Sequence, residues 1–202
     1  QGVEYKFCLP KTAGLRLPFS SMAQSEGASL LCRAYIETEN KDYLDVAIMA
    51  VKFMLKPVEE GGTAYYKGNA ITLEEASDEL TILNGMMFSI WGLYDVWLLT
   101  RDSELKETLR GTVRTLASLL KRYDRGYWSN YDLEKTIASP FYHDLHIEQL
   151  KVMYKLFGNE EFKEVYERWI KYQNSFVKSK IAFVVKAVQK LRKIEDEVAL
   201  VK

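Results

Sequence analysis

The chain has 202 residues, of which 48% are hydrophobic, 13% are aromatic and only four are proline; this composition is typical of a folded globular domain and not of a disordered segment. The 28 Lys and Arg residues are balanced by 28 Asp and Glu residues, so the net charge predicts no general attraction to nucleic acid or to an anionic membrane. No run of 18 apolar residues occurs, and no basic segment with an apolar core opens the chain. We therefore expect a soluble chain without a membrane span or a signal peptide.

Two features limit what can be said about compartment and redox chemistry. The chain begins with Gln1 and not with methionine, which indicates a fragment or a processed protein and leaves the cellular compartment open. Its two cysteines, Cys8 and Cys32, form no CxxC pair and have no third thiol. They match neither a disulfide framework nor a zinc pattern, so we expect free, buried thiols.

The elements predicted in chain order are almost all helical. Residues 1–20 contain two of the four prolines and predict an extended lead-in. Apolar residues at helical spacing then predict a hairpin of helices over residues 21–38 and 42–55. A second hairpin is predicted over 85–100 and 103–123, and a third over 144–157 and 160–172. Residues 85–100 are apolar almost all round, as in a buried inner helix.

The turns inside the three hairpins share a weak internal repeat. Each turn is short and polar, an aromatic residue precedes it, and a large apolar or aromatic residue starts the following helix. The residues before the turns are Tyr35, Trp97 and Tyr154, and those after them are Tyr43, Leu105 and Phe162. Repeated hairpins bury their apolar faces only by packing side by side. The sequence therefore predicts an all-α fold, in which the helical hairpins of residues 21–175 form an α/α toroid or an incomplete (α/α) barrel.

Three segments do not fit the hairpins. Residues 61–83 and 124–142 are too long for inert connectors and are candidate rim loops. The tail, residues 176–202, places Val177, Ile181, Val184, Val185, Val188 and Leu191 on one stripe. This stripe predicts a C-terminal amphipathic helix, which would either cap the toroid or pair with a second copy of the chain in a homodimer.

Three ordered stretches resemble a known family. They read LRLPFSSMAQ from Leu15, LNGMMFSIWGLYD from Leu83, and YDL from Tyr131 followed by YHDLHIEQL from Tyr142. In the third stretch both the order and the spacing match. Over about residues 9–173 the chain resembles the C-terminal helical domain of the D-glucuronyl C5-epimerases.

The resemblance implies a reaction and its partners. It implies inversion at C5 of a uronic acid residue within an acidic polysaccharide, of the glucuronate-to-iduronate type, without a metal or another cofactor. Removing the C5 proton builds negative charge beside a carboxylate, so one group must take the proton and another must return one from the opposite face. The resemblance also implies an N-terminal β-rich domain, not contained in these residues, that completes the substrate cleft.

The matching motifs assign roles to named residues. Tyr131 and Tyr142 are the candidate catalytic acid and base, in either order, and a tyrosine with a reference pKa of ~10 needs a nearby positive charge to act as the base. His143, His146 or an arginine would supply that charge. The motifs give the candidate substrate-binding residues as His143, His146, Asn84, Arg33 and Glu75.

The residues themselves allow plainer interpretations. A tyrosine at a loop–helix junction is usually packing, and Asn84 with Gly85 also suits a simple helix start. His143 and His146 are spaced i, i+3 and so share one helix face, but no firm third ligand accompanies them, and we expect no metal.

The chain also departs from the family pattern. The family continues its Tyr-Asp-Leu motif with Arg-His, whereas this chain has Glu134 and Lys135. The family has Glu-Glu-Tyr ahead of its Asn-Gly helix, whereas no tyrosine follows Glu75, and only Tyr65 and Tyr66 could take that place if their loop folds back.

These departures keep two other functions open. One is a non-catalytic carbohydrate-binding or scaffold module of the same fold. The other is a glycoside hydrolase or lyase that uses carboxylates such as Asp78, Glu79 or Asp132.

Overall fold

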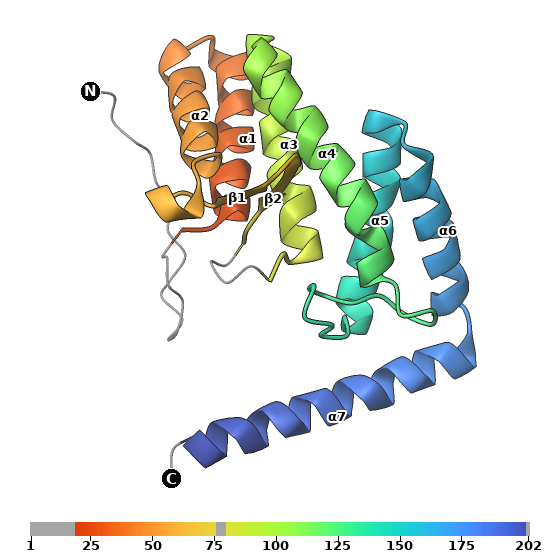
Figure 1. The fold of residues 1–202 in the computed structure, drawn as a ribbon. Helices are drawn as coiled ribbons and strands as arrows, with labels where there is room; N and C mark the ends of the chain where they lie inside the picture. Colours follow the sequence, from red (N-terminus) through yellow and green to blue (C-terminus); the bar gives the residue numbers. More distant parts are fainter. Residues whose placement is uncertain (1–18, 76–79, 201–202) are drawn as a thin grey trace. The chain divides into compact units, whose positions relative to one another are not determined.

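The computed structural model describes residues 19–75 and 80–200. The lead-in up to residue 18, Cys8, Asp78 and Glu79 lie outside the described residues. Within them the chain forms seven α-helices, one 3₁₀ turn (Val58–Glu60) and one two-stranded sheet (Figure 1), so the prediction of a mostly helical protein is confirmed. None of the described helices is both long and apolar enough to cross a membrane. The described residues divide into two compact units, one ending at Ser118 and the other starting at Leu119.

The first unit is organised around its buried third helix. It contains α1 (Ser21–Thr38), α2 (Lys41–Met54), α3 (Leu83–Thr100) and most of α4 (Ser103–Tyr123). The helix α1 packs against both α2 and α3. As the sequence predicts for an inner helix, α3 has many fully buried apolar side chains, which include Met86, Met87, Ile90 and Leu93. This core fixes the α1 and α3 residues that the family motifs single out.

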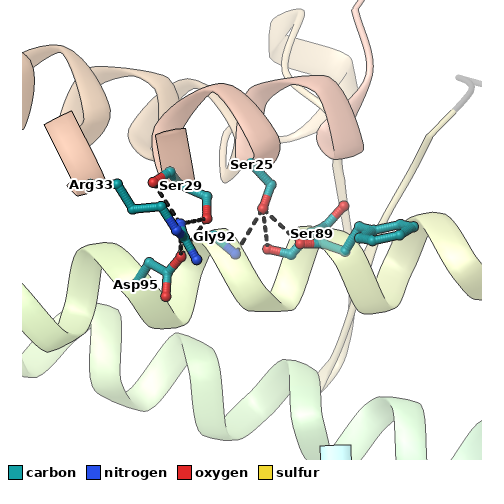
Figure 2. Close-up of polar contacts among 7 residues, drawn as sticks. Ser25, Ser29, Arg33, Ser89, Gly92 and Asp95 are labelled. Atoms are coloured by element: carbon teal, nitrogen blue, oxygen red, sulfur yellow. Dashed lines mark hydrogen bonds and ion pairs between the residues drawn. The ribbon is translucent and has the colours of Figure 1, made fainter. Parts of the chain in front are cut away.

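Small residues allow α1 and α3 to cross at close range. A Cβ atom on Gly92 would lie 2.8 Å from the backbone carbon of Ser25, which is inside van der Waals contact. The space is used for polar pairing (Figure 2): the Gly92 N–H donates to Ser25 Oγ over 2.9 Å, and this hydroxyl lies 3.0 Å from the Ser89 carbonyl oxygen. Gly92 is therefore required by the backbone-to-backbone approach of the two helices.

Cys32 is the cysteine that the structure describes, and its environment makes it unreactive. Cys32 is a free, buried thiol, as expected from the sequence. Burial, and then the negative charge of Asp95, raise the pKa of Cys32 to about 11. The thiol therefore stays protonated at neutral pH and is a poor nucleophile.

The three predicted turns share one backbone geometry. Each first helix ends in a residue with left-handed φ, and the N–H of that residue donates over 2.8 Å to the carbonyl of the aromatic residue four positions earlier. These donor–acceptor pairs are Glu39 with Tyr35, Arg101 with Trp97, and Gly158 with Tyr154. An Asn or Asp follows each of them and precedes the next helix. The repeat seen in the sequence is thus a repeated αL cap followed by a new helix start.

The loop between α2 and α3 contains a small sheet. β1 (Ala64–Lys67) pairs antiparallel with β2 (Ala70–Leu73). The sheet packs on α4 through Ile71. The Ile71 Cδ1 atom lies 3.1 Å from the position that a Cβ atom on Gly111 of α4 would occupy. The Ile71 N–H donates to Thr115 Oγ1 of α4 over 3.0 Å. The Tyr66 hydroxyl donates to the carbonyl of Leu55 over 2.6 Å. Much of the expected rim loop is therefore a hairpin fixed against α2 and α4.

The second unit contains α5 (Pro140–Phe157), α6 (Glu160–Gln173) and α7 (Phe176–Leu200). The helix α5 packs on α6, and α7 contacts α6. The helix α5 begins four residues earlier than the pattern predicts, because Ser139 caps it by accepting from the Tyr142 N–H over 3.3 Å and Pro140 occupies its first turn. Tyr142 and His143 therefore lie in a helix and not in the preceding loop.

The loop between α4 and α5 is folded back on itself and held by α7. Antiparallel bridges join Asp124 to Ser129 and Asn130 to Ile137. The side chain of Gln189 in α7 accepts from the Ile137 N–H over 2.9 Å, and the Lys186 ammonium donates to the Ile137 carbonyl over 2.8 Å. One face of α7 therefore fixes the loop.

The opposite face of α7 is apolar and exposed. Its exposed apolar residues are Val177 (65%), Ile181 (44%), Val184 (58%), Val188 (41%) and Leu191 (62%). Their spacing alternates between four and three residues, which is the heptad pattern of a helix that pairs with another helix. The amphipathic stripe that the sequence predicts is thus not buried by the described residues.

Candidate functional site

The two candidate catalytic tyrosines meet in the second unit. Tyr131 lies in the loop between α4 and α5, and Tyr142 lies in the first turn of α5. Their ring centroids are 4.7 Å apart with an interplanar angle of 62°, an edge-on contact. Both side chains are partly exposed. Folding therefore brings two half-buried phenols, 11 positions apart in the sequence, into one place on the surface of this unit.

The two histidines of α5 form a buried cluster with the loop that carries Tyr131. His143 stacks on Trp128 with centroids 3.7 Å apart. Ser129 links the two imidazoles, because its Oγ lies 2.8 Å from His143 Nδ1 and 3.1 Å from His146 Nδ1. The Ser129 N–H also donates to His143 Nδ1 over 3.3 Å, so the proton of the neutral His143 ring sits on Nε2, which faces the Trp169 carbonyl oxygen at 3.3 Å.

Burial keeps both imidazoles uncharged. His143 and His146 are each 0% exposed. Desolvation lowers the pKa of His143 to about 4. Desolvation, and then the proximity of His143, lower the pKa of His146 to about 3. At neutral pH neither ring carries the positive charge that would stabilise a tyrosine phenolate, so this part of the sequence-based hypothesis does not fit the structure.

The cluster lies next to Tyr142 and joins two segments of the chain. The ring centroid of His146 lies 6.5 Å from that of Tyr142, and His143 directly follows Tyr142 in the sequence. Through Ser129 the cluster also ties α5 to the loop that carries Tyr131. In the part of the chain that the structure describes, no group of three or more His, Cys, Asp or Glu side chains could hold a metal ion.

A basic pocket adjoins the loop that carries Tyr131. It has a volume of about 610 Å³, within the usual range for small-molecule sites. The residues that line this basic pocket are Lys121, Arg122, Asp124, Arg125, Tyr127, Asn130, Leu133 and Lys135. Sequence reasoning missed it because the balanced total charge hides a local excess of cations. The available signal was the concentration of Lys and Arg on both sides of Tyr131.

The exposed cation among the predicted substrate-binding residues is already paired. Arg33 Nη1 lies 3.0 Å from the carboxylate of Asp95 and donates to the Ser29 carbonyl over 2.7 Å (Figure 2). Its side chain remains 65% exposed. Arg33 therefore presents a guanidinium at the surface whose charge is partly offset by Asp95.

Glu75 and Asn84 come together at the start of α3. A Cβ atom on Gly85 would lie 2.8 Å from the Glu75 Cβ, so the missing side chain of Gly85, the residue after Asn84, leaves room for Glu75. Among the described residues Glu75 Oε2 is buried without a hydrogen-bonding partner. Burial, and then the charge of Glu26, raise the pKa of Glu75. The protonated form of Glu75 is thus stabilised relative to that of a free glutamate.

The candidate residues fall into two groups. Tyr131, Tyr142 and the two histidines belong to the unit that starts at Leu119. Arg33, Glu75 and Asn84 belong to the unit that ends at Ser118. Asp132, the described carboxylate considered for a hydrolase, is 6% exposed and accepts from the Thr136 N–H over 2.9 Å, which commits it to the turn of the loop.

The chain is similar to a known protein family and to proteins of other organisms. Residues 2–171 match the family described as D-glucuronyl C5-epimerase C-terminus. The chain is 31% identical over 175 residues to the D-glucuronyl C5-epimerase of Caenorhabditis elegans, a match that covers 76% of this chain and 28% of that protein. It is also 26% identical over 155 residues to an uncharacterized protein of Methanocaldococcus jannaschii, covering 74% of this chain and 50% of that protein.

The extent of these matches defines what is shared. The chain spans half or less of the length of these two relatives. The matched region ends at residue 171, so α7 lies beyond it. Because the match includes every candidate site residue and most of the chain, this protein belongs to the D-glucuronyl C5-epimerase C-terminal family.

Proposed function

We propose that this chain is the helical part of a uronyl C5-epimerase that acts on an acidic polysaccharide, with Tyr131 and Tyr142 as the proton-transfer pair. Family membership supports the reaction class. The single structural observation that carries the assignment is the contact of the two tyrosine rings, with centroids 4.7 Å apart, on a partly exposed surface.

The chemistry needs two proton-transfer groups. One tyrosine, as a phenolate, accepts the proton from C5, and the other, as a neutral phenol, returns a proton to C5 from the opposite face. The sugar keeps its net charge, and the two tyrosines exchange protonation states and return to the starting state by proton exchange with solvent. A pyranose ring does not fit between two aromatic rings in contact, so C5 must lie at the hydroxyl ends of the pair.

The phenolate and the substrate carboxylate both need compensating positive charge. The neutral histidines leave an arginine as the remaining candidate to stabilise the phenolate. The Ser129–histidine cluster holds the two tyrosine-bearing segments together. In this proposal the histidines are positioning residues, and the hairpins close into an α/α toroid that a β-rich domain elsewhere in the protein completes.

Solvent deuterium exchange at C5 tests the proposal in the full-length protein. A uronic acid polymer is incubated in D₂O, and deuterium at C5 is measured by mass spectrometry. Tyr131→Phe and Tyr142→Phe keep the rings but remove the proton-transfer oxygen, so each should reduce exchange by roughly 10² to 10⁴. The matched control is Tyr166→Phe in α6, whose ring centroid lies 6.4 Å from that of Tyr154 in α5. This control should keep the wild-type rate. Undiminished exchange in both catalytic variants would refute the assignment.

A specific observation favours one other function. Glu134 is exposed where the family has a cation, which suits a carbohydrate-binding module that no longer performs the reaction. That alternative predicts binding of a uronic acid polymer by wild-type protein, with no C5 exchange in any variant.

A further inference from the structure

The basic pocket contains an excess of positive charge that the described residues do not neutralise. Four of its lining side chains are cations: Lys121, Arg122, Arg125 and Lys135. The carboxylate that lines it, Asp124, lies 2.7 Å from Arg168 Nε and is therefore already paired. Among the side chains that the structure describes, those of residues 19–75 and 80–192, no carboxylate forms an ion pair with any of the four cations. Clustered like charges repel one another, and an anion bound among them would relieve that repulsion.

The central arginine of the pocket is held in place. Arg125 Nε lies 3.2 Å from the Tyr127 hydroxyl oxygen, and its Nη1 donates over 2.9 Å both to Asn130 Oδ1 and to the Lys135 carbonyl. Asn130 is only 3% exposed and is itself fixed, because its Nδ2 donates to the Arg122 carbonyl over 3.0 Å. A guanidinium fixed in this way loses little freedom when it binds a ligand, and its Nη2, which hydrogen-bonds none of the described residues, can donate to a carboxylate.

The position of the pocket along the chain relates it to the tyrosines. Asn130 and Leu133, which line the pocket, flank Tyr131 and Asp132 in the same folded loop. Position 134, where the family motif has a cation, holds a glutamate, while the neighbouring Lys135 lines the pocket. Tyr127 adds an aromatic ring, a surface on which sugar rings commonly pack.

We propose that the basic pocket binds a carboxylate of a uronic acid residue in the polysaccharide chain, one that neighbours the residue presented to Tyr131 and Tyr142. This assignment rests on the proposed function for the identity of the polymer. It gives this chain a polymer-binding subsite built from Arg125 and the lysines around it, in place of the missing cation at position 134.

Calorimetric titration of the full-length protein with an oligosaccharide that contains glucuronate tests the assignment. The second ligand is the same oligosaccharide with its carboxyl groups reduced to alcohols. Lys121→Gln and Lys135→Gln combined remove two exposed charges without touching the hydrogen bonds that fold the loop. This double variant should raise the Kd roughly tenfold at low ionic strength, and the reduced oligosaccharide should lose as much affinity or more. The matched control combines Lys171→Gln and Lys190→Gln, two exposed lysines of α6 and α7, and should stay within about twofold of wild type.

A second variant tests the arginine itself. Arg125→Lys keeps the charge but loses the guanidinium N–H donors that are fixed in the loop. It should therefore weaken binding of the oligosaccharide, while the salt dependence of binding stays close to that of wild type. Equal affinity of wild type and the double lysine variant, or equal affinity for the native and the reduced oligosaccharide, would overturn the assignment even if C5 exchange is observed. Carboxylate-dependent binding that is lost in the pocket variants, with no C5 exchange in wild type, would instead support the pocket and refute the epimerase reaction.

Discussion

The buried histidine pair predicts how the stability of the second unit depends on pH. His143 and His146 have folded-state pKa values lowered to about 4 and about 3 by burial, against ~6.5 in an unfolded chain. A histidine whose pKa is lowered by folding takes up a proton more readily in the unfolded chain than in the folded one. Its contribution to stability is therefore fully present above the unfolded pKa and is lost as pH falls. The loss therefore starts near pH 6.5 and continues down to the folded pKa values.

The size of the effect follows from the same values. At pH 5 an unfolded histidine is almost fully protonated, while both folded histidines are almost fully neutral. Each histidine then costs about 2 kcal/mol of unfolding free energy relative to pH 7, or about 4 kcal/mol for the pair. The raised pKa of Glu75, which belongs to the first unit, acts there in the opposite direction, because acid favours the protonated form that folding stabilises.

Urea unfolding at pH 7 and pH 5 measures this difference, and His146→Leu isolates it. The variant removes one of the two groups that titrate, so it should lose about 2 kcal/mol less than wild type between pH 7 and pH 5. The change with pH is the readout, because the substitution also alters absolute stability. An identical loss in wild type and His146→Leu would refute the conclusion that burial keeps this ring neutral.

Three further predictions concern the packing around the site. Gly92→Ala should lower the melting temperature by about 4–10 °C, because the new Cβ atom would meet the α1 backbone. Gly111→Ala should leave the melting temperature unchanged or raise it, because its Cβ atom meets only the end of the flexible Ile71 side chain. Equal melting temperatures for the two variants would contradict this reasoning. Gln189→Leu removes the acceptor of the Ile137 N–H, so hydrogen exchange at that amide should accelerate by roughly tenfold, and an unchanged rate would show that α7 does not hold the loop. If the exposed stripe of α7 forms a homodimer, light scattering should give a dimer mass for wild type and a monomer mass for Val184→Glu; a monomeric wild type would exclude the dimer.

The residues of the site differ in their exposure to solvent. The fully buried groups, His143, His146 and Ser129, hold the segments together and are neutral. The partly exposed groups, Tyr131 and Tyr142, are the ones that a substrate can reach. A substitution at Ser129 would therefore change the geometry of the tyrosine pair without removing either of the two groups that the proposed function places at the sugar.

Local sequence determined the helices and their turns. Helical periodicity predicts each of the hairpins, and the αL caps after Tyr35, Trp97 and Tyr154 follow from turns that contain Asn, Asp or Gly. These features depend on neighbouring residues in the chain, so a pattern in the sequence is enough to find them. The early start of α5 is also a local feature, because Ser139 and Pro140 form a helix-start signal that apolar periodicity does not include.

The tertiary structure decided what the site residues can do. That His143 and His146 are neutral depends on the Trp128, Ser129 and Trp169 groups that enclose them, and no spacing along the chain encodes that enclosure. The basic pocket likewise exists only because the loop folds back and places Arg125 against Asn130 and Lys135. Desolvation and charge clustering are properties of groups brought together from distant positions, so the sequence supplied the residue types while folding set their protonation states and their possible ligand.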